Sequence, residues 1–296
     1  MKISFGAPTS GPWARPDNLR QVAGRAEELG YAGLWTFQRL LYPEGHPMGP
    51  VYRSVHDPLI TLAHLSAVTS RIELGVGVVN AFMQPVMLAK QFATLQTLAG
   101  GRLVAGVGLG WVEEEFTASG VDFAGRGRRA EEFVQVLRAC WNDEVVAYEG
   151  EFYRVPPAHM DPKPEPGPPP VLLGGAAEPA LRRAGRIGDG WMSSSREDLT
   201  TIDAKIAVVR AAAEEAGRDP GALRFVVRGV TKVRSGQRAP LTGTYEQIRA
   251  DVDELAGKGV TELFHDLNFD PEIVTAEPGE AMRRAEEALE ALAPRP

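Results

Sequence analysis

Short apolar runs alternate with longer amphipathic segments along most of the chain. The segments between the runs carry apolar side chains at helical spacing, as at Leu19, Val22 and Ala26. Such alternation is typical of a parallel sheet covered by helices. The runs that we expect to form strands are Ile3–Ala7, Gly33–Phe37, Ile72–Val79, Leu103–Val107, Val171–Leu173, Gly190–Ser193, Phe225–Val230 and Glu262–Leu267. Eight strand–helix repeats predict an α/β fold, a (β/α)8 TIM barrel.

Two segments interrupt this rhythm. Residues 41–57 form a long segment after the second run, and residues 142–170 combine a hairpin-like stretch with eight prolines between Pro156 and Pro170. Proline disfavours helix and favours extended chain. Too little sequence remains on either side for two independent α/β domains. We therefore expect one barrel domain over residues 1–296, with insertions at 41–57 and 142–170.

The composition is that of a globular protein with a sizeable core, since 44% of the 296 residues are hydrophobic and 24% are charged. A formal net charge of −7 argues against nucleic acid and anionic membranes as main partners. There is no apolar stretch of about 18 residues, and the first residues resemble a strand instead of a signal peptide. Cys140 is the single cysteine, which excludes internal disulfides and suits a cytoplasmic protein.

Glycine-rich turns follow two of the expected strands. Gly106, Gly108 and Gly110 alternate at the end of one run, and Gly174-Gly175 ends another just before an expected helix. Uncovered backbone N–H groups let an anion or a flat ring approach closely. The first spacing differs from the G-x-G-x-x-G dinucleotide fingerprint. Together the turns predict a binding site, although plain strand-to-helix turns have the same pattern.

The other strand ends carry hydrogen-bonding side chains but no familiar catalytic constellation, and catalysis in a TIM barrel takes place at the C-terminal strand ends. Paired carboxylates, metal-ligand spacing and a nucleophile elbow are all absent from the sequence there. We therefore expect no metal site. Ser193–Ser195 could hydrogen-bond a ligand, and Arg228 and Asp266 also stand at strand ends. This content suits a barrel that holds a large planar cofactor, which supplies the hard chemistry.

The residues around the glycine turns resemble a known superfamily, the bacterial luciferase-like monooxygenases. The stretches that carry this resemblance are Leu95–Phe116 with Gly120 and Arg126, and Pro169–Gly175 with Leu181–Trp191. The pattern from Trp35 to Leu40 and the stretch Glu149–Tyr153 resemble the branch that depends on the deazaflavin coenzyme F420. The resemblance covers residues 2–270.

The resemblance implies a bacterial luciferase-like barrel, commonly dimeric, with a flavin or deazaflavin ring over the strand ends. Relatives have a non-prolyl cis peptide at the position of Gly77-Val78, which bulges toward the ring. The side chain and phosphate of the cofactor would lie along the glycine turns. The implied cofactor-binding residues are Gly77, Val78, Asn80, Gly108, Leu109, Gly110, Gly174, Gly175, Ala176 and Trp191.

Two positions depart from the family pattern. Many relatives have an acidic residue and a histidine after the second strand, where this chain has Gln38 and Arg39. The sugar-phosphate dehydrogenases of the family have a carboxylate where Trp111 stands, so this activity is not expected here. Arginine stays protonated and cannot shuttle protons, but it can hold an anionic substrate or stabilise developing negative charge.

These departures set the candidate roles. The catalytic candidates are Arg39, Gln38 and His56. Tyr42, His265, the bound cofactor and water are alternative proton donors to His56. Trp111 and Tyr42 are the substrate-binding candidates, and the aromatic residues of the two insertions favour an apolar organic substrate.

Arg126, Arg128 and Arg129 cluster where an expected helix begins, although the N-terminal end of a helix disfavours cations. Solvated ion pairs are one interpretation of this cluster. The other is a docking site for the anionic tail of the deazaflavin, assisted by Arg182 and Arg183.

The sequence thus predicts an oxidoreductase that uses coenzyme F420 to pass a hydride to or from a small organic substrate, reducing a polarised C=C or C=N bond. One alternative is an FMN-dependent luciferase-like monooxygenase, which activates oxygen on reduced flavin. Another is a non-catalytic flavin- or deazaflavin-binding barrel, because both usual proton-transfer side chains are replaced. We expect a homodimer with no nucleic acid or membrane partner.

Overall fold

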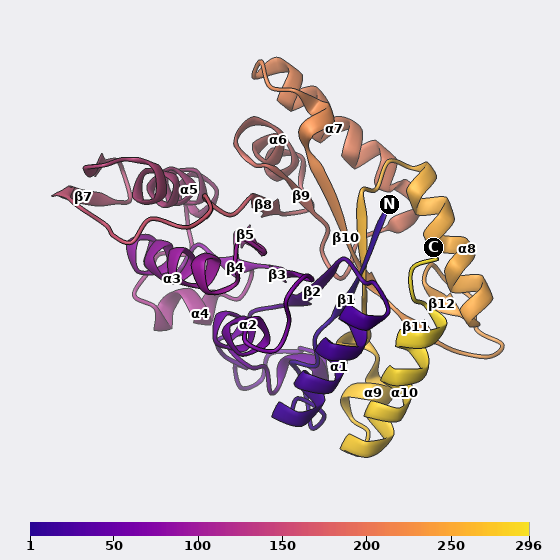
Figure 1. The fold of residues 1–296 in the computed structure, drawn as a ribbon. Helices are drawn as coiled ribbons and strands as arrows, with labels where there is room; N and C mark the ends of the chain where they lie inside the picture. The colour runs from indigo at the N-terminus through magenta and orange to yellow at the C-terminus, as the bar shows by residue number, and fades with distance from the viewer. Residues whose placement is uncertain (296) are drawn as a thin grey trace.

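Eight parallel strands close into a barrel in the computed structural model, which describes residues 1–295 (Figure 1). The barrel strands are β1 (Lys2–Gly6), β2 (Gly33–Thr36), β3 (Glu73–Val76), β5 (Leu103–Gly108), β8 (Val171–Gly174), β9 (Gly190–Met192), β10 (Arg224–Val230) and β13 (Glu262–Asp266). Each strand pairs with its neighbours in this order, and β1 pairs with β13 to complete the ring. Every one of the eight expected runs overlaps a barrel strand, so the predicted TIM barrel is confirmed.

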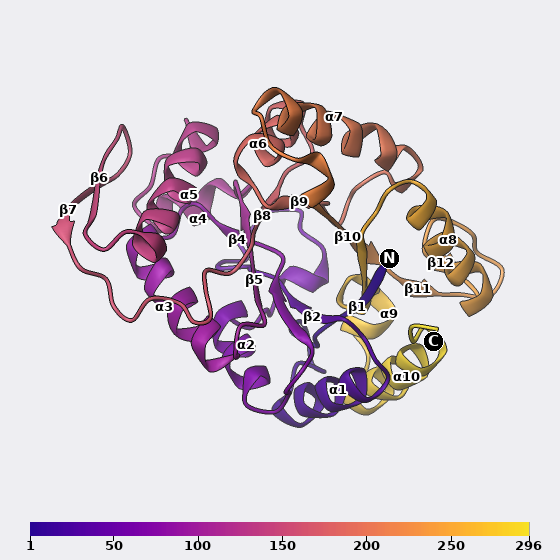
Figure 2. The ribbon, with the colours of Figure 1, turned by 45° about the horizontal axis from the view of Figure 1, so that its top comes forward.

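Helices surround the barrel (Figure 2). The larger ones are α1 (Pro16–Glu28), α2 (Pro58–Ser66), α3 (Pro85–Leu98), α5 (Arg126–Asn142), α6 (Glu178–Ile187), α7 (Ile202–Glu215), α8 (Tyr245–Gly257) and α10 (Pro278–Ala291). The shorter α4 (Glu113–Ala118) and α9 (Pro271–Val274) follow β5 and β13. Four of the long helices begin with proline, whose missing N–H has no partner to lose at that position. No helix within residues 1–295 is long and apolar enough to cross a membrane.

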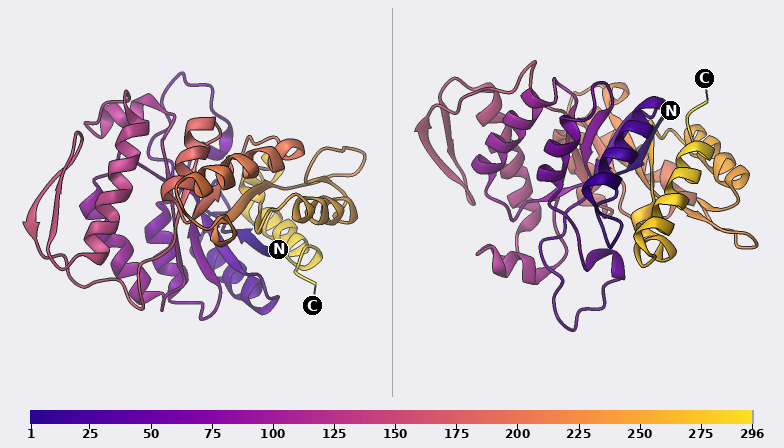
Figure 3. Two further views of the ribbon diagram at one scale, coloured as in Figure 1. Left: turned by 90° about the horizontal axis from the view of Figure 1, so that it is seen from above. Right: turned by 60° about the horizontal axis from the view of Figure 1, so that its bottom comes forward.

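The expected insertion at 142–170 contains an antiparallel hairpin, β6 (Val146–Glu149) and β7 (Arg154–Ala158), which lies outside α5 at the edge of the molecule (Figure 3). The Glu132 carboxylate of α5 accepts backbone hydrogen bonds from Glu151 and Phe152 at 2.8 and 2.9 Å. The hairpin is therefore held against the helix, and the proline-rich chain after it leads back to β8.

The remaining short elements lie in the connections. They are β4 (Val79–Asn80), β11 (Lys232–Val233), β12 (Thr242–Gly243), η1 (Pro50–Tyr52), η2 (Leu199–Thr201), η3 (Pro220–Ala222) and η4 (Leu267–Phe269). The η1 turn is the regular part of the expected 41–57 insertion, and an isolated bridge joins Val55 to Ser10. This bridge fixes the end of the insertion beside the loop after β1.

Large side chains fill the lower part of the barrel. Trp35 stacks on Phe264 with ring centroids 5.3 Å apart, and its indole N–H donates to the buried Glu262 carboxylate at 2.9 Å. Ser4 donates to the same carboxylate at 2.7 Å, and Arg224 also pairs with it. Gly75 makes the arrangement possible, because a Cβ there would overlap the Trp35 ring.

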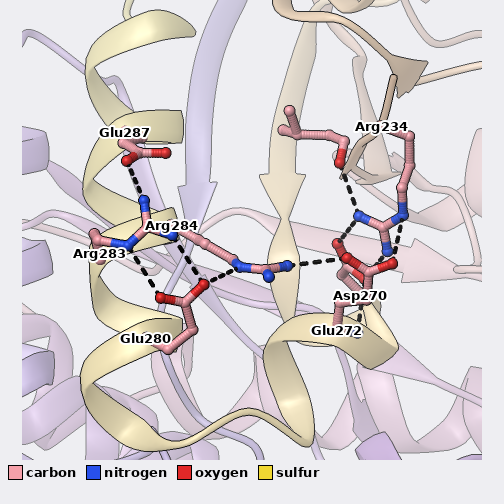
Figure 4. Close-up of polar contacts among 8 residues, drawn as sticks. Arg234, Asp270, Glu272, Glu280, Arg283, Arg284 and Glu287 are labelled. Carbon is pink, nitrogen blue, oxygen red and sulfur yellow. Dashed lines mark hydrogen bonds and ion pairs between the residues drawn. The ribbon is translucent and has the colours of Figure 1, made fainter. Parts of the chain in front are cut away.

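A chain of ion pairs links α9 and α10 to the connection that follows β11 (Figure 4). Arg234, which follows β11, pairs with Asp270 and with Glu272 of α9. The other Glu272 oxygen accepts from Arg284 of α10 at 3.0 Å, and Arg284 pairs with Glu280 at 2.7 Å. Networks of this kind hold orientation better than single exposed pairs, each of which contributes little.

Matched glycine substitutions test the packing at the barrel floor. Gly75→Ala should lower the free energy of unfolding by about 1–3 kcal/mol, because the rigid Trp35 ring must move. Gly24→Ala, in α1 with no atom near the added methyl group, should raise it by about 0.5–1 kcal/mol. Urea unfolding measures both. Equal effects of the two variants would contradict the packing argument.

Candidate functional site

A cavity of about 360 Å³ opens at the C-terminal ends of the barrel strands, within the usual size range of small-molecule sites. Its lining comes from nearly every turn at that end of the barrel. The residues that line it are Phe37, Gln38, Arg39, Tyr52, Gly77, Val78, Asn80, Gly108, Leu109, Gly110, Trp111, Arg126, Gly174, Gly175, Ala176, Met192, Ser193, Ser194, Ser195 and Arg228.

A larger hollow of about 630 Å³ lies between α1 and α10. Charged side chains line most of it, and several of them pair across it, as Arg25 does with Glu290 at 2.9 Å. These are solvated surface ion pairs, and within residues 1–295 no hydrophobic residue lines this hollow. The cavity at the strand ends is therefore the candidate site.

The expected cis peptide at Gly77-Val78 is confirmed, and both residues line the cavity. The two glycine turns lie beside this peptide, because Gly108 and Gly174 both approach Val78, and Gly110 is in the left-handed region at φ 75°. A Cβ at Gly108 would overlap Val78, so close packing alone requires glycine there. A Cβ at Gly174 would lie 3.4 Å from Val78, which is an ordinary contact. Packing therefore does not require glycine at position 174, and its missing side chain leaves space in the cavity.

Gln38 has its hydrogen-bonding capacity committed to neighbours. Its side-chain oxygen accepts from the backbone N–H and the side-chain amide of Asn80, at 2.9 and 3.1 Å. Its amide nitrogen contacts the Met83 sulfur at 3.1 Å. Gln38 thus orients Asn80 and fixes the end of β4, and an amide has no proton to exchange near neutral pH.

Arg39 forms a buried ion pair that sequence reasoning missed. Its Nη1 donates to Glu115 of α4 at 2.8 Å, and the two side chains are only 4% and 1% exposed. Glu115 also accepts the backbone N–H groups of Leu40 and Leu41 at 2.7 and 3.1 Å. The guanidinium lies over the ring of Trp111, at 4.7 Å from its centroid, and also over Tyr52. Arg39 therefore presents a fixed cation between two aromatic faces.

A second buried ion pair lies at the base of the cavity. Arg228 Nε donates to Asp266 at 2.7 Å, and its Nη1 contacts the Gly77 carbonyl at 3.4 Å. Its guanidinium stacks on Phe37 and Phe269, at 4.4 and 4.2 Å from their centroids. The sequence placed Arg228 and Asp266 at expected strand ends, but it did not indicate that the two side chains form an ion pair.

Three of the proposed site residues do not line the cavity. Trp191 is fully buried behind a glycine turn, where its indole N–H donates to the Gly175 carbonyl at 2.8 Å. Tyr42 donates its hydroxyl to Met48 at 2.9 Å, and the backbone of His56 bonds to Thr9. The other proposed residues all border the cavity: Gln38, Arg39, Gly77, Val78, Asn80, Gly108, Leu109, Gly110, Trp111, Gly174, Gly175 and Ala176.

His265, an alternative proton donor, is buried and lies away from the cavity. Its ring contacts the Thr231 hydroxyl at 2.9 Å. Its neighbours along β13, Phe264 and Asp266, face the interior of the barrel, and successive strand residues face opposite sides. Burial, with a smaller contribution from Arg249, lowers the pKa of His265 to about 3. The structure therefore contradicts a role for His265 as proton donor.

The expected arginine cluster does not converge on one point. Only Arg126 borders the cavity. Arg128 pairs with Glu151 at 2.8 Å on the surface, and Arg129 donates to the carbonyl of Asp122. The two helping arginines of α6 also have partners elsewhere, Glu215 for Arg182 and Glu131 for Arg183. Of these five arginines, Arg126 is the one placed to contact a molecule bound in the cavity, and the docking site stays a prediction.

Within residues 1–295, the cavity lining contains no histidine, carboxylate, lysine or cysteine. Its ionisable groups are three arginines and the Tyr52 phenol. Arginine stays charged at any working pH. The same part of the chain has no group of three histidine, cysteine, aspartate or glutamate side chains placed to hold a metal ion. The cavity can therefore bind, orient and stabilise charge, but it brings almost no acid–base chemistry of its own.

Comparison with known proteins identifies relatives of the chain. A family model described as luciferase-like monooxygenase matches residues 3–239. An uncharacterised protein of Mycobacterium tuberculosis (strain ATCC 25618 / H37Rv) is 32% identical over 248 residues, which cover 75% of this chain and 85% of that protein.

Two more distant relatives have assigned activities. An F420-dependent glucose-6-phosphate dehydrogenase of Kineococcus radiotolerans is 31% identical, with 74% of this chain and 65% of the relative covered. An FMNH(2)-dependent dimethylsulfone monooxygenase of Pseudomonas putida is 28% identical, with 82% and 63% covered. The match thus spans less than two thirds of either relative. Among solved structures, an F420-dependent secondary alcohol dehydrogenase in complex with an F420-acetone adduct has the same fold, with a TM-score of 0.79, 17% identity and 98% of both chains covered.

The burial of His265 predicts a pH dependence of stability. A histidine in the unfolded chain binds a proton near pH 6.5, whereas the folded protein keeps His265 neutral down to a pKa of about 3. Between these values the unfolded state binds more protons, so the free energy of unfolding should fall as the pH falls from about 6.5 toward 3. Above about pH 6.5 the residue should contribute no pH dependence.

Urea unfolding at a series of pH values measures this effect. His265→Gln should reduce the slope of stability against pH over that window, and the same substitution at exposed His159 is the matched control. If His265→Gln keeps the full wild-type slope, the buried neutral histidine is not its source.

Proposed function

The chain belongs to the luciferase-like monooxygenase family, and we propose that it is an oxidoreductase that uses the deazaflavin coenzyme F420. It transfers a hydride to or from a small organic substrate and reduces a polarised C=C or C=N bond. The observation that carries this proposal is the cavity lining, which holds cations and aromatic faces but almost no proton-transfer group. A site of this kind needs a bound group that supplies the reactive atoms.

The cavity suits a flat, anionic cofactor. Backbone of the two glycine turns forms one wall, and Gly174 leaves room beside Val78. Arg126 borders the same cavity and carries no carboxylate partner within residues 1–295, so it is free to hold an anionic group. When bound, the deazaflavin supplies or accepts a hydride at carbon. The turn residues Gly108–Gly110 and Gly174–Ala176 would hold it.

The chain's own side chains would handle the substrate. Arg39, fixed by Glu115, offers oriented N–H donors that stabilise negative charge as it develops. Trp111, 45% exposed at the mouth of the cavity, provides an aromatic face for an organic molecule. The proton donor proposed first, His56, lies outside the lining, whereas the Tyr52 phenol lies within it. Tyr52 is therefore the better candidate to give a proton.

The rival cofactor is FMN. Its support is the FMNH(2)-dependent relative, which is similar over 82% of this chain. The relative with an F420-dependent activity has a slightly higher identity, 31% against 28%. Deazaflavin and flavin differ in chemistry at the central ring, and only a reduced flavin activates oxygen for a monooxygenase reaction.

Cofactor titration tests the proposal. Purified protein without cofactor is titrated with F420 and, separately, with FMN, and fluorescence reports binding. We expect F420 to bind with a Kd of about 1 μM or less and FMN to bind at least about tenfold more weakly, a difference of about 1.4 kcal/mol. The opposite preference would replace the proposal with the FMN-dependent monooxygenase. Binding of neither molecule would reject both.

Gly174→Ala tests where the cofactor lies. The added methyl group meets only ordinary contacts, so the fold should keep its stability, while the cavity becomes narrower. Accommodating a methyl group against a bound ring costs about 1–3 kcal/mol, so the Kd for F420 should rise by about tenfold. Gly24→Ala in α1 is the control and should leave the Kd unchanged. An unchanged Kd for Gly174→Ala would remove this turn from the cofactor site.

A further inference from the structure

The Arg228 guanidinium has hydrogen-bonding capacity that the protein leaves unused. Its side chain is 9% exposed and borders the cavity. Nε is committed to Asp266, whereas Nη2 is shielded from water and has no partner within residues 1–295. Unsatisfied buried donors are uncommon and call for an explanation. A small shift of the lining side chains would bring Nη2 to the cavity surface, where an acceptor oxygen on a bound molecule would satisfy it while the ion pair stays intact.

The surroundings hold this guanidinium in one orientation. Phe37 and Phe269 contact it through their ring faces, at 4.4 and 4.2 Å from their centroids. Asp266 is itself fixed, because its other oxygen accepts from the backbone and side chain of Asn268 at 3.0 and 2.9 Å. A donor whose orientation is held before the reaction is effective in stabilising charge that appears during it.

The charge balance indicates which kind of oxygen fits. Asp266 already neutralises Arg228 at 2.7 Å, so the pair presents a polar donor and little net charge. A neutral pair cannot compensate the two charges of a dianion such as a phosphate monoester, whereas a single negative charge on one conjugated oxygen would form a charge-assisted hydrogen bond with Nη2.

The aromatic wall adds a requirement of shape. Phe37, Tyr52 and Trp111 line the cavity near the two buried arginines. Tyr52 packs against Trp111 and Phe37, with centroids 5.7 and 6.4 Å apart. Flat faces of this kind favour a planar, conjugated molecule.

We propose that Arg228 binds the oxygen of a planar, conjugated carbonyl substrate and stabilises it as the negatively charged enolate. This proposal rests on the proposed function, since a hydride from the bound deazaflavin is the reductant. The hydride adds to the carbon β to the carbonyl, the electrons of the C=C bond move toward oxygen, and the oxygen becomes negative beside Nη2. A proton from Tyr52 or water then adds at the α carbon, so the substrate gains two electrons and the deazaflavin loses two.

A cofactor-free binding experiment tests this assignment. The probe is para-nitrophenolate, a planar molecule with one anionic conjugated oxygen, and nitrobenzene is its uncharged counterpart. Purified protein is titrated with each in mildly alkaline buffer, and the change in absorbance reports binding. Removing both charges in the double variant R228Q/D266N should raise the Kd for para-nitrophenolate by about tenfold and leave the Kd for nitrobenzene almost unchanged.

The single variant D266N distinguishes a binding role of Arg228 from a merely structural one, because only a binding role predicts tighter binding of the anion. With Asp266 neutral, Arg228 carries an uncompensated charge, so para-nitrophenolate should bind about threefold or more tightly than to wild-type protein. Because an uncompensated buried charge is destabilising, circular dichroism checks the fold of each variant, and the double variant carries the test if D266N does not fold. R283Q, which removes an exposed arginine of α10, is the matched control and should match the wild-type protein.

Three results would overturn the assignment: no binding of para-nitrophenolate to wild-type protein, equal binding by R228Q/D266N, or an equal loss of nitrobenzene binding. Because no cofactor is present, Arg228-dependent binding can hold even if neither F420 nor FMN binds. Failure of the cofactor titration and failure of this inference are therefore distinguishable.

Discussion

The space inside the barrel is the constraint on which the site depends. An eight-stranded barrel is just wide enough for side chains to fill. Here Trp35 fills the lower part, because Gly75 has no side chain to occupy that space. The indole is anchored by stacking on Phe264 and by its hydrogen bond to Glu262. Above this floor the strands end in glycine turns and small residues, so the interior opens into the cavity instead of closing over it.

Two ion pairs then place arginine side chains in a site whose lining, within residues 1–295, has no carboxylate. Arg39 and Arg228 come from opposite halves of the sequence, and each has a buried acidic partner together with aromatic faces. The partners keep both arginines fixed and reduce their net charge. The cavity therefore acts on oxygen atoms through oriented N–H groups more than through a strong overall field, which is an arrangement suited to charge that develops during a reaction.

Periodicity was enough to predict the eight strands, and glycine spacing the two turns of the cavity wall, because these depend on local sequence. The position of the cis peptide came from the resemblance to the luciferase-like family. The partners of the arginines were not predictable in the same way. Glu115 is 76 residues from Arg39 and is one of three successive glutamates, of which the orientation of α4 buries one. Strand alternation could have placed Trp191 correctly: its neighbour Met192 faces the cavity, so Trp191 faces outward.

The lack of histidine, carboxylate, lysine and cysteine in the lining, within residues 1–295, has a consequence for how such a protein can change over evolution. Where a bound cofactor supplies the reactive atoms, the residues of the cavity wall can vary in shape without loss of the reaction. Substitutions in the loops around Tyr52 and Trp111 would then exchange one substrate for another while the catalytic power stays intact. We therefore expect related proteins with this kind of cavity to differ in the substrates that they bind.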